Sequence, residues 1–205
     1  MRSIRILLLA LLSIDVAAAA APGERTLLVF GDSLSAAYGL RADQGWVPRL
    51  QERLTRQGYG YRVVNASVSG ETTAGGRARL ARALDMHQPQ LVILGLGAND
   101  GLRGLPVKDA RANLSGMIKE IQQRKAGVLL AGILMPPNYG RYASDFAAIY
   151  TELSKEHKVP LIPFLLEGAA LDSRYMQSDG LHPNAAGQPL LLENVWKHLV
   201  PLLER

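Results

Sequence analysis

Five short apolar segments punctuate the chain, and each is mostly continuous rather than alternating with polar residues. Continuous apolar runs of this length are typical of strands that are covered on both faces of a sheet. Turn-forming or helical stretches separate them, so each run predicts one strand. The predicted strands are Thr26–Phe30, Tyr61–Ala66, Gln90–Gly95, Gly127–Leu134 and Val159–Phe164.

Between and after these runs, apolar residues recur at steps of three and four, which places them on one face of a helix. The clearest examples are Trp46–Leu54, Val107–Ile121, Phe146–Leu153 and Leu191–Leu202. Strands that alternate with helices predict an α/β fold with a parallel sheet and helices on both faces. In such a sheet the loops that follow the strands share one edge, where ligands bind.

The start of the chain has the pattern of a secretory signal peptide over its first 21 residues. Arg2 and Arg5 precede the apolar run Ile6–Leu12, and small residues after it allow cleavage after Ala19 or Ala21. An uncleaved membrane anchor is the weaker alternative, because the run is shorter than the ~20 residues that span a bilayer. We expect an exported protein in a bacterial periplasm.

The composition fits a single domain over residues 22–205, since 48% of the chain is hydrophobic. The formal charge is +5, but the basic residues are scattered, which argues against nucleic-acid binding and leaves weak attraction to a phospholipid surface possible. Cysteine is absent, which excludes a thiol nucleophile and a cysteine-ligated zinc site. No histidine pair has metal-ligand spacing, so we expect no metal site. We also expect no other cofactor, and we expect a monomer.

The segment Gly31-Asp32-Ser33-Leu34 follows the first predicted strand directly. A serine at this place lies where open α/β sheets bind ligands. Taken alone, Ser33 is equally well explained as a helix N-cap. The functional interpretation places a helix N-terminus beneath its hydroxyl, which favours developing negative charge. The surrounding residues lack the Gly-x-Ser-x-Gly pattern of the usual nucleophile elbow.

A carboxylate and an imidazole lie close together near the other end of the chain, at Asp179 and His182. A catalytic imidazole needs a carboxylate on one ring nitrogen and the nucleophile on the other. Asp179 could provide this carboxylate from the same loop as His182. Its structural interpretation is the cap of a turn. The other three histidines, His87, His157 and His198, are expected on the surface or at helix ends.

Amide donors for a tetrahedral oxyanion are expected from three places. The segment Gly97–Gly101 follows the third predicted strand and contains Asn99, whose side-chain amide can donate. The same segment is also rich in turn-forming residues, which is its structural interpretation. The backbone amides of Ser33 and Gly70 are the other candidate donors, and a glycine allows a ligand to approach closely. Asp32 and Asp100 are read as structural turn residues rather than catalysts.

In this order, Gly31–Leu34, Gly70, Gly97–Asp100 and Asp179–His182 resemble the four signature blocks of the SGNH (GDSL) hydrolase family. Each block alone is a weak signal, but four in register on an α/β pattern are a strong one. The resemblance extends over about residues 26–200 and is closest to the branch of exported thioesterases, lysophospholipases and arylesterases.

The resemblance implies a flavodoxin-like three-layer α/β/α sandwich with about five parallel strands. It implies a catalytic triad of Ser33, His182 and Asp179, and an oxyanion hole formed by the amides of Ser33 and Gly70 with Asn99. It further implies a mobile lip over residues 71–77 and an acyl groove lined by residues 136–139. The residues expected to contact substrate are Glu71, Thr72, Leu102, Pro137, Asn138 and Tyr139.

The expected function is hydrolysis of small-molecule carboxylic esters and thioesters, such as acyl-CoA-type thioesters, lysophospholipids and aryl esters, through an acyl-enzyme. Pro136-Pro137 departs from the family pattern and leaves the acyl-chain preference open. An alternative is a carbohydrate or peptidoglycan O-acetyl esterase, which could use the same triad. A non-catalytic nucleotide or flavin binder is disfavoured, because Asp100 occupies the place of the third glycine in a dinucleotide fingerprint.

Overall fold

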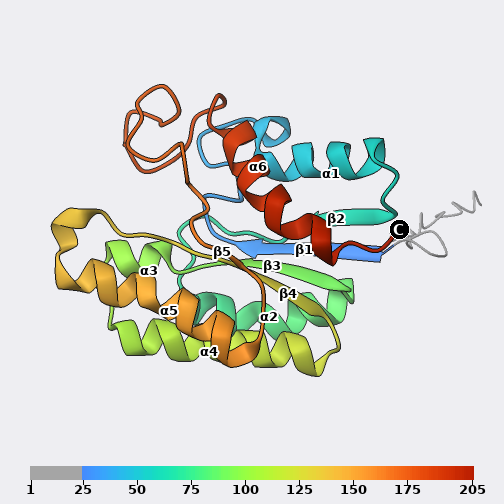
Figure 1. The fold of residues 1–205 in the computed structure, drawn as a ribbon, viewed down its shortest axis with the longest axis horizontal. Helices are drawn as coiled ribbons and strands as arrows, with labels where there is room; N and C mark the ends of the chain where they lie inside the picture. The colour runs from blue at the N-terminus through green and yellow to red at the C-terminus, as the bar shows by residue number, and fades with distance from the viewer. Residues whose placement is uncertain (1–24) are drawn as a thin grey trace, which may run out of the picture.

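The computed structural model describes residues 25–205, which form a five-stranded parallel sheet in the order β2-β1-β3-β4-β5 (Figure 1). The predicted signal peptide lies outside the described residues. The predicted α/β architecture is confirmed, with helices on both faces of one sheet. The strands are β1 Arg25–Gly31, β2 Tyr61–Asn65, β3 Leu91–Gly95, β4 Gly127–Ala131 and β5 Leu161–Ile162.

Two helices, α1 and α6, cover one face of the sheet, and α2, α4 and α5 cover the other (Figure 1). Within residues 25–205, no helix has the length and apolar character needed to cross a membrane. The α-helices are α1 Trp46–Arg56, α2 Thr73–His87, α3 Ala98–Leu102, α4 Val107–Gln123, α5 Arg141–His157 and α6 Gln188–Leu199. Short 3₁₀ turns occur at η1 Ala42–Gln44, η2 Pro137–Tyr139 and η3 Val200–Leu202.

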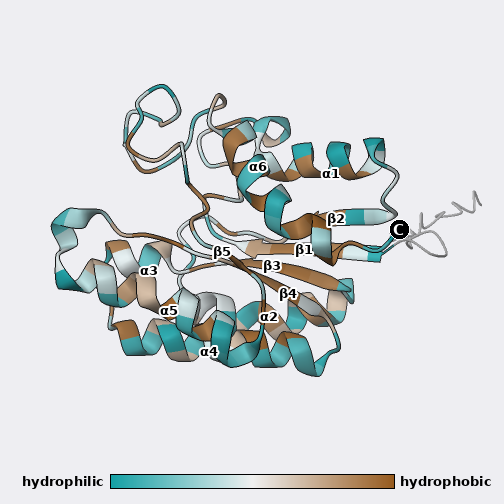
Figure 2. Cartoon of the chain, in the orientation of Figure 1, coloured by the Kyte–Doolittle hydropathy of each residue, from teal (hydrophilic) through white to brown (hydrophobic). Residues whose placement is uncertain are grey.

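The core is formed by strands that are buried on both faces and by the inner stripes of the helices. Figure 2 shows apolar strands between helices whose outer faces are polar. Residues Leu27–Phe30 of β1 and Val92–Leu94 of β3 are at most 1% exposed. Full burial of one such side chain contributes about 1.5–3 kcal/mol. The two strands end side by side, with Gly31 paired to Gly95, so the loops after them are neighbours.

Strands β4 and β5 are shorter than the sequence predicted. Pro160 and Pro163 flank the two residues of β5, and proline has no amide proton with which to extend a ladder. Beyond the strands, the Gly132 amide donates to the Ile162 carbonyl at 2.8 Å and the Leu165 amide donates to the Gly132 carbonyl at 3.0 Å. Edge position and flanking prolines therefore limit a segment whose hydrophobicity alone suggested a longer strand.

The chain after the nucleophile candidate also differs from expectation. Ser33 does not begin a helix: residues 33–39 form a turn, and α1 begins only at Trp46. The Asp32 carbonyl accepts hydrogen bonds from the amides of Ser35 and Ala36, but Ala37 has φ +56°, which ends the helical geometry. The helix N-terminus expected beneath the Ser33 hydroxyl is therefore absent.

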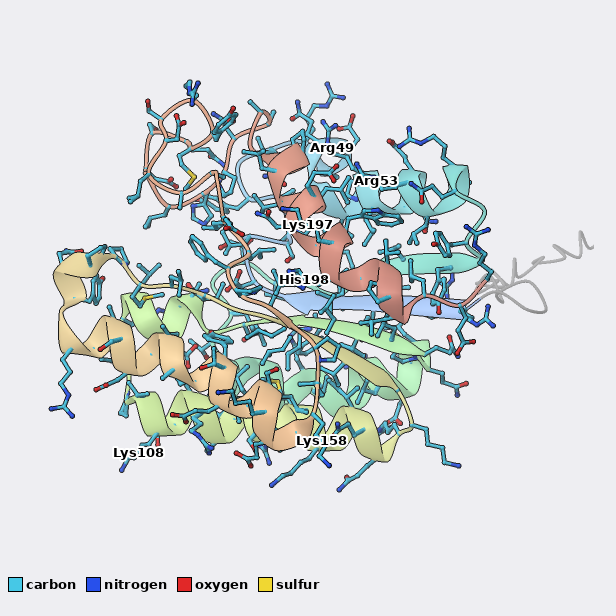
Figure 3. The ribbon with its side chains drawn as sticks, viewed as in Figure 1. Arg49, Arg53, Lys108, Lys158, Lys197 and His198 are labelled. Atoms are coloured by element: carbon cyan, nitrogen blue, oxygen red, sulfur yellow. The ribbon has the colours of Figure 1, made fainter. Side chains whose placement is uncertain are left out.

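Basic side chains are dispersed over the molecule, as their scatter along the sequence predicted. Figure 3 shows labelled basic residues on separate elements rather than in one stripe. They lie on α1, on α4, after α5 and on α6: Arg49, Arg53, Lys108, Lys158, Lys197 and His198.

Candidate active site

A hydrogen-bonded chain of three side chains lies at the carboxyl edge of the sheet. The Ser33 hydroxyl oxygen is 2.9 Å from Nε2 of His182, and Nδ1 of His182 is 2.7 Å from Oδ2 of Asp179. Ser33 follows β1, whereas His182 lies 149 residues later in the loop between β5 and α6. The parallel sheet therefore brings together the three residues that the sequence predicted as a triad.

The carboxylate of Asp179 is held from several directions. Its Oδ1 accepts the backbone amides of Leu181 at 2.9 Å and His182 at 3.0 Å, so the loop folds around it. Hydrogen bonding from the His182 ring, reinforced by these amides, lowers the pKa of Asp179 to about 2. The carboxylate is therefore ionised near neutral pH and accepts a hydrogen bond from the Nδ1–H group, which leaves Nε2 directed at Ser33.

The loop that carries His182 is fixed by Gln177, a residue that the sequence did not single out. The Gln177 amide donates to the His182 carbonyl at 2.7 Å. Its side-chain amide donates to the carbonyl of Tyr38 at 2.8 Å and to that of Pro183 at 3.1 Å. The Tyr38 ring lies 4.6 Å from the His182 ring, centroid to centroid. Gln177 thus joins the loop after β1 to the loop that carries the imidazole.

Helix α1 gives these loops a rigid support. The buried Gln188, at the start of α6, accepts the Trp46 amide through Oε1 at 2.9 Å. The Trp46 indole donates to the carbonyl of Leu34 at 3.2 Å. Because Leu34 follows Ser33 directly, α1 and α6 are both linked to the turn that carries the hydroxyl.

The candidate oxyanion donors lie on the neighbouring loops after β2 and β3. Asn99 stands in the first turn of α3, and its side-chain amide donates to the Glu71 carbonyl at 2.9 Å, which fixes its orientation. Gly70 has φ +79°, a conformation that favours glycine. Within residues 25–205, the backbone amides of Ser33 and Gly70 have no hydrogen-bond acceptor. They can therefore donate to a bound oxyanion.

Two further residues hold this side of the site: Arg103, to which the sequence analysis gave no function, and Asp100, which it indicated as structural. Arg103 follows α3 and donates to the Gly70 carbonyl at 3.1 Å, which supports the Gly70 peptide. The buried Asp100 accepts the backbone amide of Thr73 at 2.8 Å and its hydroxyl at 2.6 Å. This pair joins α3 to the start of α2, so Asp100 is structural, as expected.

Residues 73–77 of the expected mobile lip over residues 71–77 form the first part of α2, which begins at Thr73. Thr72 is the N-cap of this helix, and its hydroxyl accepts the Gly75 amide at 3.2 Å. Glu71 forms a salt bridge with Arg79 at 2.6 Å. The side chains of both predicted substrate contacts are therefore engaged within the fold.

The other predicted substrate contacts lie on two neighbouring loops. Pro137, Asn138 and Tyr139 form the 3₁₀ turn η2 after β4, and the first two are exposed. The Tyr139 hydroxyl donates to the carbonyl of Leu102 at 3.3 Å. The structure thus brings Leu102 next to η2, in the region predicted as an acyl groove.

Asp32 has an unusual environment for a carboxyl group. It is fully buried, its Oδ1 accepts the Leu34 amide at 3.0 Å, and its Oδ2 has no hydrogen-bond partner within the described chain. Burial raises the pKa of Asp32 to about 7, although charge on His182 opposes this rise and Asp100 adds to it. The sequence indicated a turn residue here but gave no sign of a perturbed pKa.

A second serine–histidine pair does not have the geometry of a relay. The Ser115 hydroxyl is 2.8 Å from Nε2 of His157, and the nearest carboxylate, on Glu156, lies 3.5 Å from the same nitrogen. A relay requires the carboxylate on the opposite nitrogen. His157 ends α5, as expected of a helix-end histidine. Residues 25–205 also contain no group of three or more His, Asp or Glu side chains able to hold a metal ion.

An α/β sandwich that carries a Ser–His–Asp relay at the carboxyl edge of its sheet has the architecture of a serine hydrolase. Residues 29–190 match the model of the GDSL-like Lipase/Acylhydrolase family. The chain belongs to this family, which confirms the resemblance inferred from its four sequence blocks.

Named relatives support the same conclusion. The chain is 52% identical over 180 residues to Esterase TesA of Pseudomonas aeruginosa, covering 87% of this chain and 90% of that protein. It is 42% identical over 179 residues to "Thioesterase 1/protease 1/lysophospholipase L1" of Escherichia coli K12, covering 87% and 85%. A crystal structure of TesA superimposes with a TM-score of 0.86 at 52% identity and covers 87% of this chain and 100% of that one.

Proposed function

We propose that this protein hydrolyses carboxylic esters and thioesters through an acyl-enzyme formed on Ser33. The main observation in support is the pair of hydrogen bonds that links Ser33, His182 and Asp179 at 2.9 and 2.7 Å. This order places the imidazole between a hydroxyl and a carboxylate, as nucleophilic catalysis by serine requires.

In the first step, Nε2 of His182 accepts the hydroxyl proton of Ser33 while the serine oxygen bonds to the substrate carbonyl carbon. Asp179 stays ionised, accepts a hydrogen bond from the Nδ1–H group and so stabilises the imidazolium that results. The imidazolium then gives its proton to the alcohol or thiol leaving group, and the C–O or C–S bond breaks. Water repeats the sequence on the acyl-serine, releases the acid and restores the hydroxyl.

The negative oxygen of each tetrahedral intermediate would be bound by the amides of Ser33 and Gly70 and by the side chain of Asn99. One such donor is worth roughly 10²–10³ in turnover. The Asn99 amide group has two protons, and the bond to Glu71 uses one, so the other is available. Arg103 would act as a positioning residue for Gly70 through its carbonyl.

The substrates proposed are acyl-CoA-type thioesters, lysophospholipids and aryl esters. The names of the relatives, esterase and thioesterase/lysophospholipase, support this range. A carbohydrate O-acetyl esterase remains the rival. Comparison of acetylated sugars with medium-chain p-nitrophenyl esters would separate the two, and a preference for acetylated sugars would favour the rival.

The decisive experiment is labelling with a fluorophosphonate followed by peptide mapping. We expect modification of Ser33, and loss of both labelling and turnover in Ser33→Ala with retained folding by circular dichroism. Ser115→Ala is the matched control, because Ser115 also contacts a histidine but lacks the relay geometry. A label on any residue other than Ser33 would refute the assignment.

We further propose that the chain is exported to a periplasm as a monomeric single domain over residues 22–205. The amino-terminal sequence pattern supports export. Mass spectrometry of the mature protein would test cleavage after Ala19 or Ala21, and a start at Met1 would contradict it.

A further inference from the structure

Exposed large apolar side chains are unevenly distributed over the molecule. Seven occur within residues 25–205; five of them lie on loops that directly follow strands of the sheet, and a sixth, Leu105, lies in the loop between α3 and α4. The seventh, Met86, lies near the end of α2. The six, which we call the apolar rim, are Tyr38, Val68, Leu105, Leu134, Leu171 and Leu181.

Five members of the apolar rim come from the loops after β1, β2, β4 and β5, and Leu105 comes from the loop that joins α3 to α4. These loops meet at the end of the sheet that carries Ser33, remote from the chain's C-terminus (Figure 1). Leu171 is 87% exposed and Tyr38 is 53% exposed. Single exposed apolar residues are ordinary, but a concentration on one edge marks an interaction surface.

The apolar rim adjoins the candidate active site directly. Tyr38 lies against the His182 ring, and Leu181 precedes His182 in the same loop. Val68 lies two residues before Gly70, on the side of the candidate oxyanion donors. A partner that covered these side chains would therefore also cover the approach to Ser33.

A shallow groove extends the apolar rim from Leu134 along α5. Its volume is about 550 Å³. Apolar side chains make up much of its wall: Ala147, Ala148, Pro163 and Phe164. The exposed apolar surface is thus broader than the six rim residues alone.

Two ion pairs lie beside the apolar rim, in the loops that carry Leu171 and Tyr38. Arg174 pairs with Asp172 at 2.6 Å in the loop that carries Leu171. Arg41 pairs with Asp43 in the loop that carries Tyr38. Adjacent positive and negative groups complement a headgroup that itself carries both charges, and they give no strong attraction to an anionic surface.

From these observations we propose that the apolar rim docks the protein onto the surface of zwitterionic phospholipid aggregates, with the active site facing the lipid. The inference rests on the proposed function, because lysophospholipids present their ester bonds at such surfaces. Rim side chains would enter the boundary between headgroups and acyl chains, as apolar groups of interfacial proteins do. The ester would reach Ser33 without crossing bulk water.

A sedimentation assay with phosphatidylcholine vesicles tests the docking. The assay uses Ser33→Ala as the background protein, so that no turnover of lipid occurs. We expect the Ser33→Ala protein to bind the vesicles. Adding Leu134→Ser and Leu171→Ser to it should weaken its partition onto the vesicles about tenfold, since two apolar groups are lost. Met86→Ser on the same background is the matched control and should bind unchanged. Absence of binding, equal binding by all variants, or binding that requires anionic lipid and is abolished by salt would overturn the proposal.

Kinetics separate the docking from the proposed function. With Ser33 intact, the Leu134→Ser/Leu171→Ser variant should hydrolyse soluble p-nitrophenyl butyrate at the parent rate. On micellar lysophosphatidylcholine it should be several-fold slower, whereas Met86→Ser should match the parent on both substrates. Equal rates of all proteins on micelles would overturn the docking. If the parent protein cleaves neither substrate, the proposed function fails, while the vesicle assay still decides whether the rim binds lipid.

Discussion

At the scale of single residues, the site depends on polar groups whose environment differs sharply over a short distance. Asp179 is partly exposed, accepts several hydrogen bonds and has a pKa lowered to about 2. Asp32, next to the nucleophile, is fully buried, and burial raises its pKa to about 7. Only the Asp179 carboxylate is placed to stabilise an imidazolium on His182. Proximity to Ser33 in the sequence therefore does not determine which acid belongs to the triad.

Asp32 should make stability depend on pH in a predictable direction. Its pKa is raised in the folded state from 3.8, so folding favours the protonated form. The free energy of unfolding should therefore fall as pH rises from about 4 to 7, by on the order of 4 kcal/mol for a shift of this size. Asp32→Asn cannot ionise and should flatten this slope in urea titrations at a series of pH values. Identical slopes for variant and parent would contradict the burial argument.

Asn99 should affect the chemical step more than the binding of substrate. Asn99→Ala removes a donor to the oxyanion, which forms only during the reaction, so kcat should fall roughly 10²–10³-fold with little change in KM. The variant also loses the bond to Glu71, worth about 1 kcal/mol of stability, which a melting curve would detect. Slower fluorophosphonate labelling, still at Ser33, is expected, and a parent-like kcat would remove Asn99 from the oxyanion hole.

At the scale of elements, the site is positioned by contacts between helix starts and loops. Asp100 of α3 binds both the amide and the hydroxyl of Thr73, which begins α2. Gly97 precedes α3 with φ +123°, and a Cβ there would overlap the Tyr150 hydroxyl of α5. The start of α3, and with it Asn99, is therefore fixed both from α2 and from α5.

Removal of the Asp100 carboxylate should destabilise this junction. Asp100→Ala leaves two buried donors of Thr73 without acceptors, at a cost of roughly 3 kcal/mol. For a protein of this size that corresponds to a fall in Tm of about 6–12 °C. The control is Asp109→Ala in the exposed first turn of α4, which should cost only about 0.5 kcal/mol. Equal melting temperatures for the two variants would show that the junction carries little stability.

The sequence predicted the elements best where burial alone determines them. β1 and β3 are buried on both faces, and α4 presents one continuous apolar stripe, so their local patterns were sufficient. β5 was overestimated because its edge position and its prolines limit pairing. The turn after Ser33 was mistaken for a helix start because the positive φ at Ala37 leaves no sign in hydrophobic spacing.

Residues that act through tertiary contacts were the hardest to predict. Tyr38, Arg103 and Gln177 each contact the site from a different loop, and no local motif marks them. The meeting of Ser33 and His182, 149 residues apart, was predicted from motif order and fold class rather than from spacing. Long-range partners depend on the strand order, which local patterns do not specify.

At the scale of the whole molecule, the two ends of the sheet differ in how they are held together. At the amino ends of the strands, Arg25 and Glu204 form an ion pair at 2.9 Å, and the Glu204 amide donates to the Tyr61 hydroxyl at 3.3 Å. At the carboxyl ends, the long connection over residues 163–187 contains only one isolated bridge, between Met176 and Pro183. The imidazole therefore lies in a part of the fold with little regular structure.

This difference predicts that the active site is lost before the fold. Segments with few buried apolar contacts open locally at lower cost than central strands do. In increasing urea, labelling of Ser33 by a fluorophosphonate should disappear at a lower concentration than the change in fluorescence, which reports in part on the buried Trp46 of α1. Gln177→Ala removes the bonds from the loop to Tyr38 and Pro183, so it should lower the labelling midpoint further and leave the fluorescence midpoint nearly unchanged. Coincident midpoints in the parent protein would mean that the loop and the sheet unfold as one cooperative unit.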